Sequence, residues 1–482
     1  MRRPTRGIIQ YGGAQANRLG VCLATGLALA LSGCGGHNVA TVTASTSSPT
    51  STPTSSPTSP STPTTFAVGG TVSSMASGVS VTLQNNGGDS VTVSANGAFA
   101  FPTALATDGS YSASVGSQPA GETCTVTNGA GVATANVTSI AVSCVPAEFV
   151  AFDTTGSSAA LYLYRVDPAT GALTQVPGSP YAIGIALGGM VFSPSGNTLY
   201  VGDANDSTLR AFSINRSTGA RTAIAGSPFT TVQSQPALAM DPLGKFLLSV
   251  SVNNGTLSTF GINASGGLSS SAAGTGSTGA SPVSLAVSPT GSFVYTGSSA
   301  TNNLSAFALD STTGALTAVA GSPFSTSEAL SLAIDPAGKF LYATNLTSNT
   351  VSIFSIDAST GALTSAGQAA TGSGPNGIAL TPSGRFAYVA NTGSNSVQAY
   401  SVNSTTGQLT AGSAVSPGIS PENLTVDPNG KFLYVSVLGS GGAGALQGYS
   451  IDPSSGALTS IAGSPFTSVN FPNNVAVVKL GP

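Results

Sequence analysis

Few side chains in this 482-residue sequence are of the types that carry out acid–base or nucleophilic chemistry. Charged residues make up 6% of the chain, and His37 is its one histidine. His37 follows Cys34 closely, near the start of the chain and far from the regular segments described below. The main body of the sequence therefore offers no Ser-His or Cys-His pair for nucleophilic catalysis. We predict no catalytic residue and no cofactor there.

The carboxylates that recur at regular spacing are better explained as turn residues. Asp335 begins the segment Asp-Pro-Ala-Gly, in which proline presets the second position and glycine closes the fourth, as in a type I turn. Related turns begin with serine or threonine instead, so the role of the aspartate is to cap the turn. The six turns start at Ser193, Asp241, Ser288, Asp335, Thr381 and Asp427.

These turns mark a repeat, because their prolines lie 46 to 48 residues apart, the period of a four-stranded propeller blade. An apolar run precedes each turn and a β-rich run follows it, which predicts a hairpin of the two inner strands, A and B. A second marker, Asp or Asn followed by glycine as in Asp357 to Gly361, occurs seven times and predicts a loop between the outer strands, C and D. We expect an all-β chain with a seven-bladed propeller over 147–482.

Seven outer loops against six inner turns indicate how the ring closes. Residues 149–152 and 161–166 are typical of strands B and C of a first blade that lacks strand A. Residues 474–478 are typical of an A strand with no strand after it. The C-terminal strand is therefore predicted to complete the first blade and to remove the exposed edges of the ring.

Ligands are expected where the D-to-A and B-to-C loops converge near the axis. The charges that we place there are all acidic, namely Asp153, Asp203, Asp206, Glu328 and Glu422, with no Lys or Arg beside them. With the amides that begin several A strands, they suit a neutral, hydroxyl-rich ligand such as a glycan, or a protein partner. The candidate binding residues are Gln235, Glu328, Asn376, Glu422, Asn423, Asn473 and Asn474.

Composition argues against several other partners. The chain has 13 Lys and Arg against 16 Asp and Glu, a formal charge of −3, and no basic patch for nucleic acid. No apolar run reaches the roughly 18 residues that a bilayer-spanning helix needs. The loop 203–206 carries Asp and Asn oxygens, but calcium prefers six or more ligands, so we expect a polar turn and no metal.

The first 65 residues are predicted to be an export signal and a tether. Residues 1–33 combine arginines, an apolar stretch and the ending Leu-Ser-Gly before Cys34. This ending resembles the lipobox of bacterial lipoproteins, which implies that membrane lipid is attached to Cys34; a plain secretory signal is the alternative. Gly35 in the next position then implies the outer membrane of a bacterial envelope. Residues 34–65, rich in Ser, Thr and Pro, would form an extended spacer.

Residues 66–146 are predicted to form a small separate β domain. Alternating apolar and polar runs flank Asn-Asn-Gly-Gly at 85–88, which is a hairpin signal. Cys124 and Cys144 are expected to form a disulfide in an exported chain, and a metal pair is disfavoured because no histidine accompanies them. The segment resembles the immunoglobulin-like or transthyretin-like sandwiches of bacterial surface proteins.

The propeller repeat resembles that of the lactonase-type seven-bladed propellers, the family that includes the bacterial 6-phosphogluconolactonases. The resemblance covers about 149–482 and rests on repeats such as Asp335 to Tyr342, on Thr-Gly-Ala-Leu-Thr loops such as 313–317 and on Gly-Ser-Pro-Phe segments such as 321–324. These motifs build turns and hairpins, so they specify a fold more strongly than a reaction. The resemblance implies lactone hydrolysis.

One part of the family pattern is missing. Members that act on sugar phosphates are expected to present Arg and His at the starts of their A strands. This chain has Pro-Asn-Gly at 375–377 and Pro-Glu-Asn at 421–423 instead. We therefore predict a lipid-anchored envelope protein whose propeller is a binding module, with lactone hydrolysis as the alternative.

Overall fold

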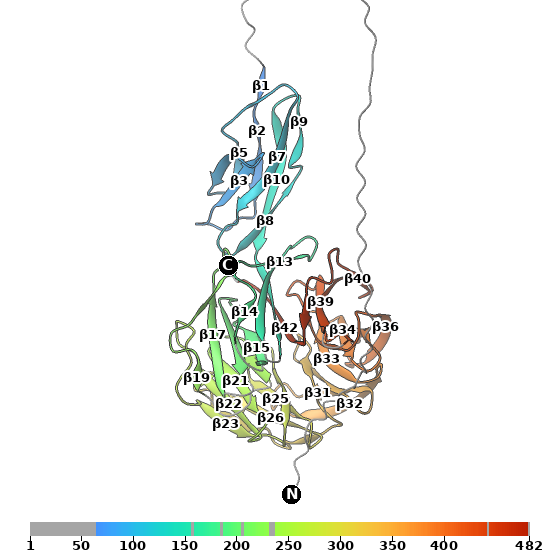
Figure 1. Cartoon of the computed structure of the whole chain (residues 1–482). Coiled ribbons are helices and arrows are strands. Elements are labelled where there is room, and N and C mark those ends of the chain that lie inside the picture. The colour runs from blue at the N-terminus through green and yellow to red at the C-terminus, as the bar shows by residue number, and fades with distance from the viewer. Residues whose placement is uncertain are drawn as a thin grey trace, which may run out of the picture. The chain divides into compact units, whose positions relative to one another are not determined.

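The computed structural model describes residues 64–155, 159–183, 187–203, 207–230, 237–440 and 443–480. Within these ranges the regular structure is β-strand, and no α-helix is present. Residues Thr62–Pro482 form one compact unit (Figure 1). In the part of the chain described, no helix has the length and apolar character to cross a bilayer.

Eight of the first ten strands form two four-stranded sheets around a core of their own, and the other two, β1 and β6, pair with each other. One sheet has the order β5-β2-β10-β8 and the other β4-β3-β7-β9. Buried side chains of both sheets, among them Val72, Leu83 and Val142, pack in one cluster. Cys124 on β8 and Cys144 on β10 form the predicted disulfide in this core. The strands are β1 (Thr65–Phe66), β2 (Val68–Ser73), β3 (Val81–Asn85), β4 (Asp89–Val93), β5 (Gly97–Ala100), β6 (Leu105–Ala106), β7 (Gly109–Ser117), β8 (Glu122–Thr127), β9 (Ala130–Ala133) and β10 (Val137–Pro146).

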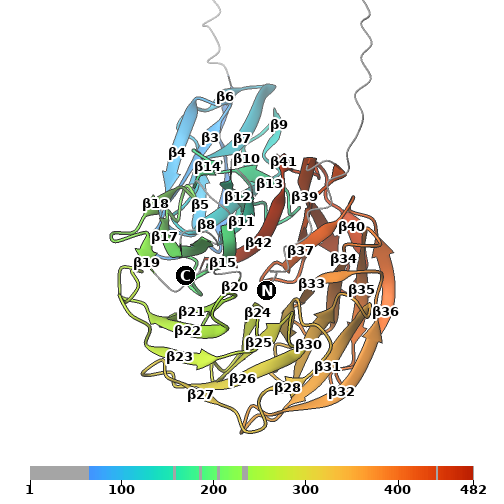
Figure 2. The same ribbon diagram turned by 60° about the horizontal axis from the view of Figure 1, so that its bottom comes forward.

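The remaining strands form seven antiparallel sheets arranged in a ring, the blades of a propeller (Figure 2). From the axis outward, the first blade consists of β42 (Pro472–Lys479), β11 (Glu148–Thr154), β12 (Ala160–Val166) and β13 (Leu173–Gln175), with β14 (Tyr181–Ala182) also paired to β12. The second blade consists of β15 (Leu187–Phe192), β16 (Thr198–Asp203), β17 (Thr208–Ile214) and β18 (Arg221–Ala223), with β19 (Phe229–Thr230) also paired to β17. The third blade consists of β20 (Ala237–Met240), β21 (Phe246–Ser251), β22 (Thr256–Gly261) and β23 (Gly274–Ser277).

The fourth to seventh blades repeat the same order of strands. They consist of β24 (Pro282–Val287), β25 (Phe293–Ser298), β26 (Asn303–Leu309) and β27 (Leu316–Ala318) with β28 (Phe324–Ser325); β29 (Leu332–Ile334), β30 (Phe340–Asn345), β31 (Thr350–Ile356) and β32 (Leu363–Ala370); β33 (Pro375–Leu380), β34 (Phe386–Asn391), β35 (Ser396–Val402) and β36 (Leu409–Val415); and β37 (Pro421–Val426), β38 (Phe432–Val437), β39 (Ala443–Ile451) and β40 (Leu458–Ser460) with β41 (Ser468–Asn470).

The C-terminal strand closes the ring as predicted. Strand β42 pairs antiparallel with β11, so that Ala476 lies opposite Ala151. The Leu480 N–H also donates to the Ala147 carbonyl at 2.7 Å, just beyond the paired strands. The first blade is therefore made from both ends of the propeller sequence, and β11 does not remain an open edge.

The recurring turn aspartates cap their own turns. Asp335 Oδ1 accepts hydrogen bonds from the backbone N–H groups of Lys339 and Phe340, each at 2.6 Å. Where serine replaces aspartate, Ser288 Oγ accepts the Phe293 N–H at 3.0 Å. These contacts hold strands A and B together, which is the turn-capping role predicted from the sequence.

Buried tyrosines connect neighbouring blades. In five blades a B-strand tyrosine hydroxyl donates to the carbonyl of the glycine in the C-to-D loop of the next blade, at 2.8–2.9 Å. That glycine has a positive φ, 74° at Gly171, which few other residues adopt. The pairs are Tyr200 with Gly266, Tyr295 with Gly361, Tyr342 with Gly407, Tyr388 with Gly456, and Tyr434 with Gly171. The last of these joins the seventh blade to the first.

Candidate functional site

The starts of the inner strands enclose a small cavity at the centre of the ring. It has a volume of about 160 Å³ and is lined by residues from six of the seven blades. Sites for drug-sized ligands usually measure about 300–1,000 Å³, so this cavity suits a smaller molecule. Its polar side chains are Asn423, Asn474, Ser284 and Ser331, and two of these, Asn423 and Asn474, belong to the set predicted from the sequence.

Asn376 and Glu422 form a polar pair on two neighbouring inner strands, β33 and β37. Asn376 Nδ2 donates to Glu422 Oε2 at 2.5 Å. Burial raises the pKa of Glu422 to about 7, and the hydrogen bond from Asn376 opposes that rise. At neutral pH the carboxyl is therefore present in both protonation states, and it can accept a proton or donate one.

Asn474 is held by Asp153, a fully buried carboxylate on β11. The backbone N–H of Asn474 donates to Asp153 Oδ1 at 2.8 Å, and its Nδ2 donates to Oδ2 at 3.1 Å. The same Nδ2 donates to the Gly188 carbonyl at 2.6 Å, so both amide hydrogens are used and the amide oxygen is the group left for a ligand. Burial raises the pKa of Asp153 to about 7, against the lowering effect of the Asn474 hydrogen bonds.

Asn423 and Asn473 are joined across the seventh and first blades. Asn423 Nδ2 donates to the Asn473 carbonyl at 3.1 Å, and Ser436 Oγ donates to the same carbonyl at 2.8 Å. Ser436 Oγ also accepts the Asn423 N–H at 3.1 Å. This network fixes the inner strand β37 against the closing strand β42, and Asn473 contributes its backbone to it.

One predicted residue, Glu328, is not part of this axial group. Glu328 Oε2 accepts the N–H and the hydroxyl of Thr347 at 2.8 and 2.7 Å and lines a separate cavity of about 460 Å³ with Asn302 and other loop residues. Gln235 and the proposed lipid-bearing Cys34 lie outside the described residues. The predicted set is therefore not one cluster in this structure.

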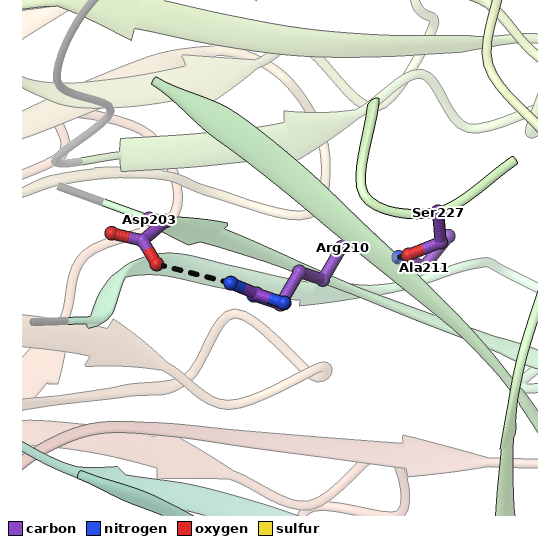
Figure 3. A network of polar contacts seen from close by, with 4 residues as sticks. All are labelled: Asp203, Arg210, Ala211 and Ser227. Carbon is purple, nitrogen blue, oxygen red and sulfur yellow. Dashed lines mark hydrogen bonds and ion pairs between the residues drawn. The ribbon is translucent and has the colours of Figure 1, made fainter. Parts of the chain in front are cut away.

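One cation does accompany the carboxylates, contrary to expectation. Arg210 Nη2 lies 3.6 Å from Oδ2 of the buried Asp203, and Figure 3 shows the guanidinium reaching back along the blade toward the end of β16. Arg210 lies on the C strand of the second blade, β17, and the repeat pattern does not reveal how far so long a side chain extends from its strand. The expectation of an unaccompanied acidic face is wrong at Asp203.

The arrangement can recognise hydroxyl groups more readily than anions. The axial cavity has amide and hydroxyl groups on its wall, and the lining residues described include no Lys or Arg. In the ranges that the structure describes, no three His, Cys, Asp or Glu side chains converge as metal ligands would. Glu422 is the axial group best suited to accept a proton near neutral pH.

Comparison with known proteins decides the family. A model of the lactonase family of seven-bladed β-propellers matches residues 148–283, 270–377 and 364–477. The chain belongs to this lactonase family. The match begins at the first residue of β11 and ends within β42, so it covers the whole ring of the lactonase propeller. No curated protein matches the chain in sequence.

Solved structures resemble this lactonase-family chain over the propeller. A candidate 6-phosphogluconolactonase of Bacteroides fragilis is 21% identical, with a TM-score of 0.60 over 69% of this chain and 98% of that one. A periplasmic gluconolactonase of Pseudomonas aeruginosa is 20% identical, with a TM-score of 0.59 over 70% of this chain and 100% of that one. At this level of identity the likeness concerns the fold.

Proposed function

We propose that the axial cavity of this lactonase-family propeller binds a small, neutral, hydroxyl-rich ligand of the monosaccharide class. The observation that carries the proposal is the polar lining of the cavity, where Asn423, Asn474, Ser284 and Ser331 present amide and hydroxyl groups. Glu422, which accepts a hydrogen bond from Asn376, directly precedes Asn423 on β37. Amide oxygens and carboxylates accept hydrogen bonds from hydroxyl groups, and amide N–H groups donate to them. A cavity of about 160 Å³ limits the ligand to about one sugar ring.

A phosphorylated sugar is a poor candidate for the same cavity. Charge-assisted hydrogen bonds from Arg or Lys are the usual source of phosphate affinity. The described cavity lining contains neither residue, and Glu422 and Asp153 lie close to it. Both carboxyls become more negative as the pH rises through about 7, so they would repel a dianion.

Calorimetric titration of the full chain with a panel of neutral monosaccharides and their 6-phosphates tests this proposal. We expect saturable binding of at least one neutral sugar and weaker or no binding of its phosphate. Asn474→Ala should weaken the binding about tenfold, since it removes the amide oxygen left to accept a hydrogen bond from a sugar hydroxyl. Glu328→Gln is the matched control outside the cavity and should bind as the unaltered protein does. Preference for the phosphorylated sugar would contradict the proposal.

A second candidate is hydrolysis of a neutral sugar lactone, which the near-neutral pKa of Glu422 favours. Ionised Glu422 would take a proton from water as that water attacks the lactone carbonyl, and the protonated Glu422 would then return this proton to the ring oxygen as the C–O bond breaks. The rate of hydrolysis of freshly dissolved glucono-δ-lactone, measured as the release of acid, should then exceed the spontaneous rate. Glu422→Gln should abolish the excess. A rate equal to the spontaneous one leaves the binding function alone. With 6-phosphogluconolactone we expect the spontaneous rate in either case.

We also propose that the protein is exported and held in the bacterial outer membrane by lipid on Cys34. The lipobox-like Leu-Ser-Gly-Cys ending of the predicted leader supports this, as does the Ser/Thr/Pro-rich spacer after it. Cells grown with a clickable palmitate analogue should label the protein, and Cys34→Ser should remove the label. Unchanged labelling of the variant would refute the anchor.

A further inference from the structure

Arg221 occupies a position where every other blade has leucine. In each blade the last residue of strand C to be paired lies opposite the residue that resumes pairing after the C-to-D loop. In the second blade this pair is Ile214 with Arg221. The leucines at this position pack in or against the apolar core clusters of the propeller, so a guanidinium is a departure from the repeat. The equivalent residues are Leu173, Leu268, Leu316, Leu363, Leu409 and Leu458.

The Arg221 guanidinium is stacked between two aromatic rings from different blades. Its Cζ lies 4.4 Å from the ring centroid of Tyr181 in the first blade and 4.1 Å from that of Phe212 in the second. Such stacking holds the charged plane in one orientation. Nε of Arg221 is buried, and among the described residues it has no hydrogen-bond partner. No carboxylate of the described residues forms an ion pair with it.

Arg221 lines a cavity between the first and second blades together with Arg210. The cavity has a volume of about 360 Å³. Among the described residues, the ion pair with Asp203 offsets the charge of Arg210, so about one positive charge in the lining has no carboxylate partner, that of Arg221. The other walls are mostly apolar and come from both blades. They are Ala182, Ile183, Phe212, Ala223 and Pro228.

Ser227 adds a hydroxyl donor to this cavity. Ser227 Oγ accepts the Ala211 N–H at 3.1 Å, and Figure 3 draws these two residues close together, to one side of Arg210. In the seventh blade the equivalent serine, Ser464, accepts a strand N–H in the same way and also donates to Gln447 Oε1 at 2.8 Å. Arg210 stands at the Gln447 position of the second blade, and a guanidinium cannot accept a hydrogen bond. The hydroxyl hydrogen of Ser227 has no acceptor among the described residues.

We propose that this cavity, between the first and second blades, binds the carboxylate of a small organic acid with an apolar body. The carboxylate would accept hydrogen bonds from the planar fork of Arg221 and from Ser227, while the apolar body packs against Ile183 and Pro228. One uncompensated cation matches a monoanion, whereas a phosphate dianion would need a second. The site is distinct from the axial cavity and does not depend on its function.

Ligand-observed NMR titration of the full chain with benzoate tests the proposal, with benzamide as the uncharged probe of the same shape. We expect saturable binding of benzoate and at least tenfold weaker binding of benzamide. Arg221→Leu restores the residue of the six other blades, so the variant should fold and melt as the unaltered protein does. Its affinity for benzoate should fall by about tenfold to a hundredfold, because a charge-assisted pair of hydrogen bonds is lost.

The proposal would be overturned by the absence of saturable benzoate binding, by equal binding of benzamide, or by equal binding of benzoate to the Arg221→Leu variant. Tighter binding of inorganic phosphate than of benzoate would also reject a carboxylate site. If Arg221→Leu lowers the melting temperature, Arg221→Lys provides a second test, because lysine keeps the charge but lacks the fork and should bind benzoate with intermediate affinity.

Discussion

Replacing Glu422 by glutamine should make the protein more stable at alkaline pH and leave its stability almost unchanged in mild acid. Burial raises the pKa of Glu422 from 4.5 to about 7. A folded-state pKa above the unfolded value means that the folded state favours the protonated carboxyl. The contribution of this preference to the free energy of unfolding is complete below about pH 4.5 and is lost as the pH rises through about 7. Glutamine keeps the shape and an acceptor for Asn376 but never ionises.

The size of the effect follows from the shift. A change from 4.5 to about 7 corresponds to about 3 kcal/mol between the two protonation states, at 1.36 kcal/mol per pKa unit. The free energy of unfolding of the Glu422→Gln variant, minus that of the unaltered protein, should therefore be near zero at pH 4.5. It should rise to about 2–3 kcal/mol by pH 8.5. Asp153 and Glu148, whose pKa values burial also raises to about 7, titrate in both proteins and cancel in the difference.

Equilibrium unfolding in urea, repeated at pH values from 4.5 to 8.5, measures this difference. The slope with urea concentration should be the same for both proteins, so that the change in midpoint reports stability. A difference that is the same at all pH values would refute the reasoning, because it would mean that Glu422 ionises equally well in the folded and unfolded states. A variant that is less stable at pH 8.5 would show that the ionised carboxylate is the form that the fold favours.

Three further outcomes test the fold. Tyr434→Phe should lower the free energy of unfolding by about 1–3 kcal/mol in urea titrations, since it leaves the buried Gly171 carbonyl without its donor; an unchanged midpoint would contradict the proposed link between the seventh and first blades. Deleting residues 474–482 removes most of the closing strand, and the melting temperature should fall far more than after loss of a free tail; a melting curve identical to that of the full chain would exclude the observed closure. Replacing Cys124 and Cys144 together by serine should cost about 3 kcal/mol in the N-terminal sheets, measured by limited proteolysis with and without reductant, and equal digestion of both proteins would mean that the disulfide contributes nothing.

The fold was predictable because its markers are local. The cap of Asp335 spans five residues, and the positive φ of the loop glycines is a property of single positions. The period of these markers predicted the four-stranded blades. The mismatch between seven outer loops and six inner turns predicted that the C-terminal strand closes the first blade. These features need no knowledge of which residues meet across the ring.

The candidate site was less predictable because its contacts join distant residues. Asn376 meets Glu422 across 46 residues, and Asn474 meets Asp153 across 321. The repeat indicated that such residues begin inner strands, but it did not indicate which of them are in contact. Glu328, for example, accepts a hydrogen bond from Thr347 in a loop of its own blade. The Arg221 cavity had a sequence signal that was not used. In the loop Thr-Gly-Ala-Arg-Thr, arginine replaces the leucine found in related copies, and comparing the repeats position by position would have found it.

The composite first blade also bears on how the chain reaches its native state. Strand β11 is synthesised well before its partner β42, because the strands of the six other blades lie between them in the sequence. Until then one inner edge has no partner, and the contact between them requires the closure of a loop more than 300 residues long, as the separation of Asp153 from Asn474 illustrates. The six later blades can form from neighbouring segments in the meantime, each against the one before. A chain that stops short by a few residues would present β11 as an open strand edge to other chains, so incomplete copies should aggregate rather than persist as smaller propellers.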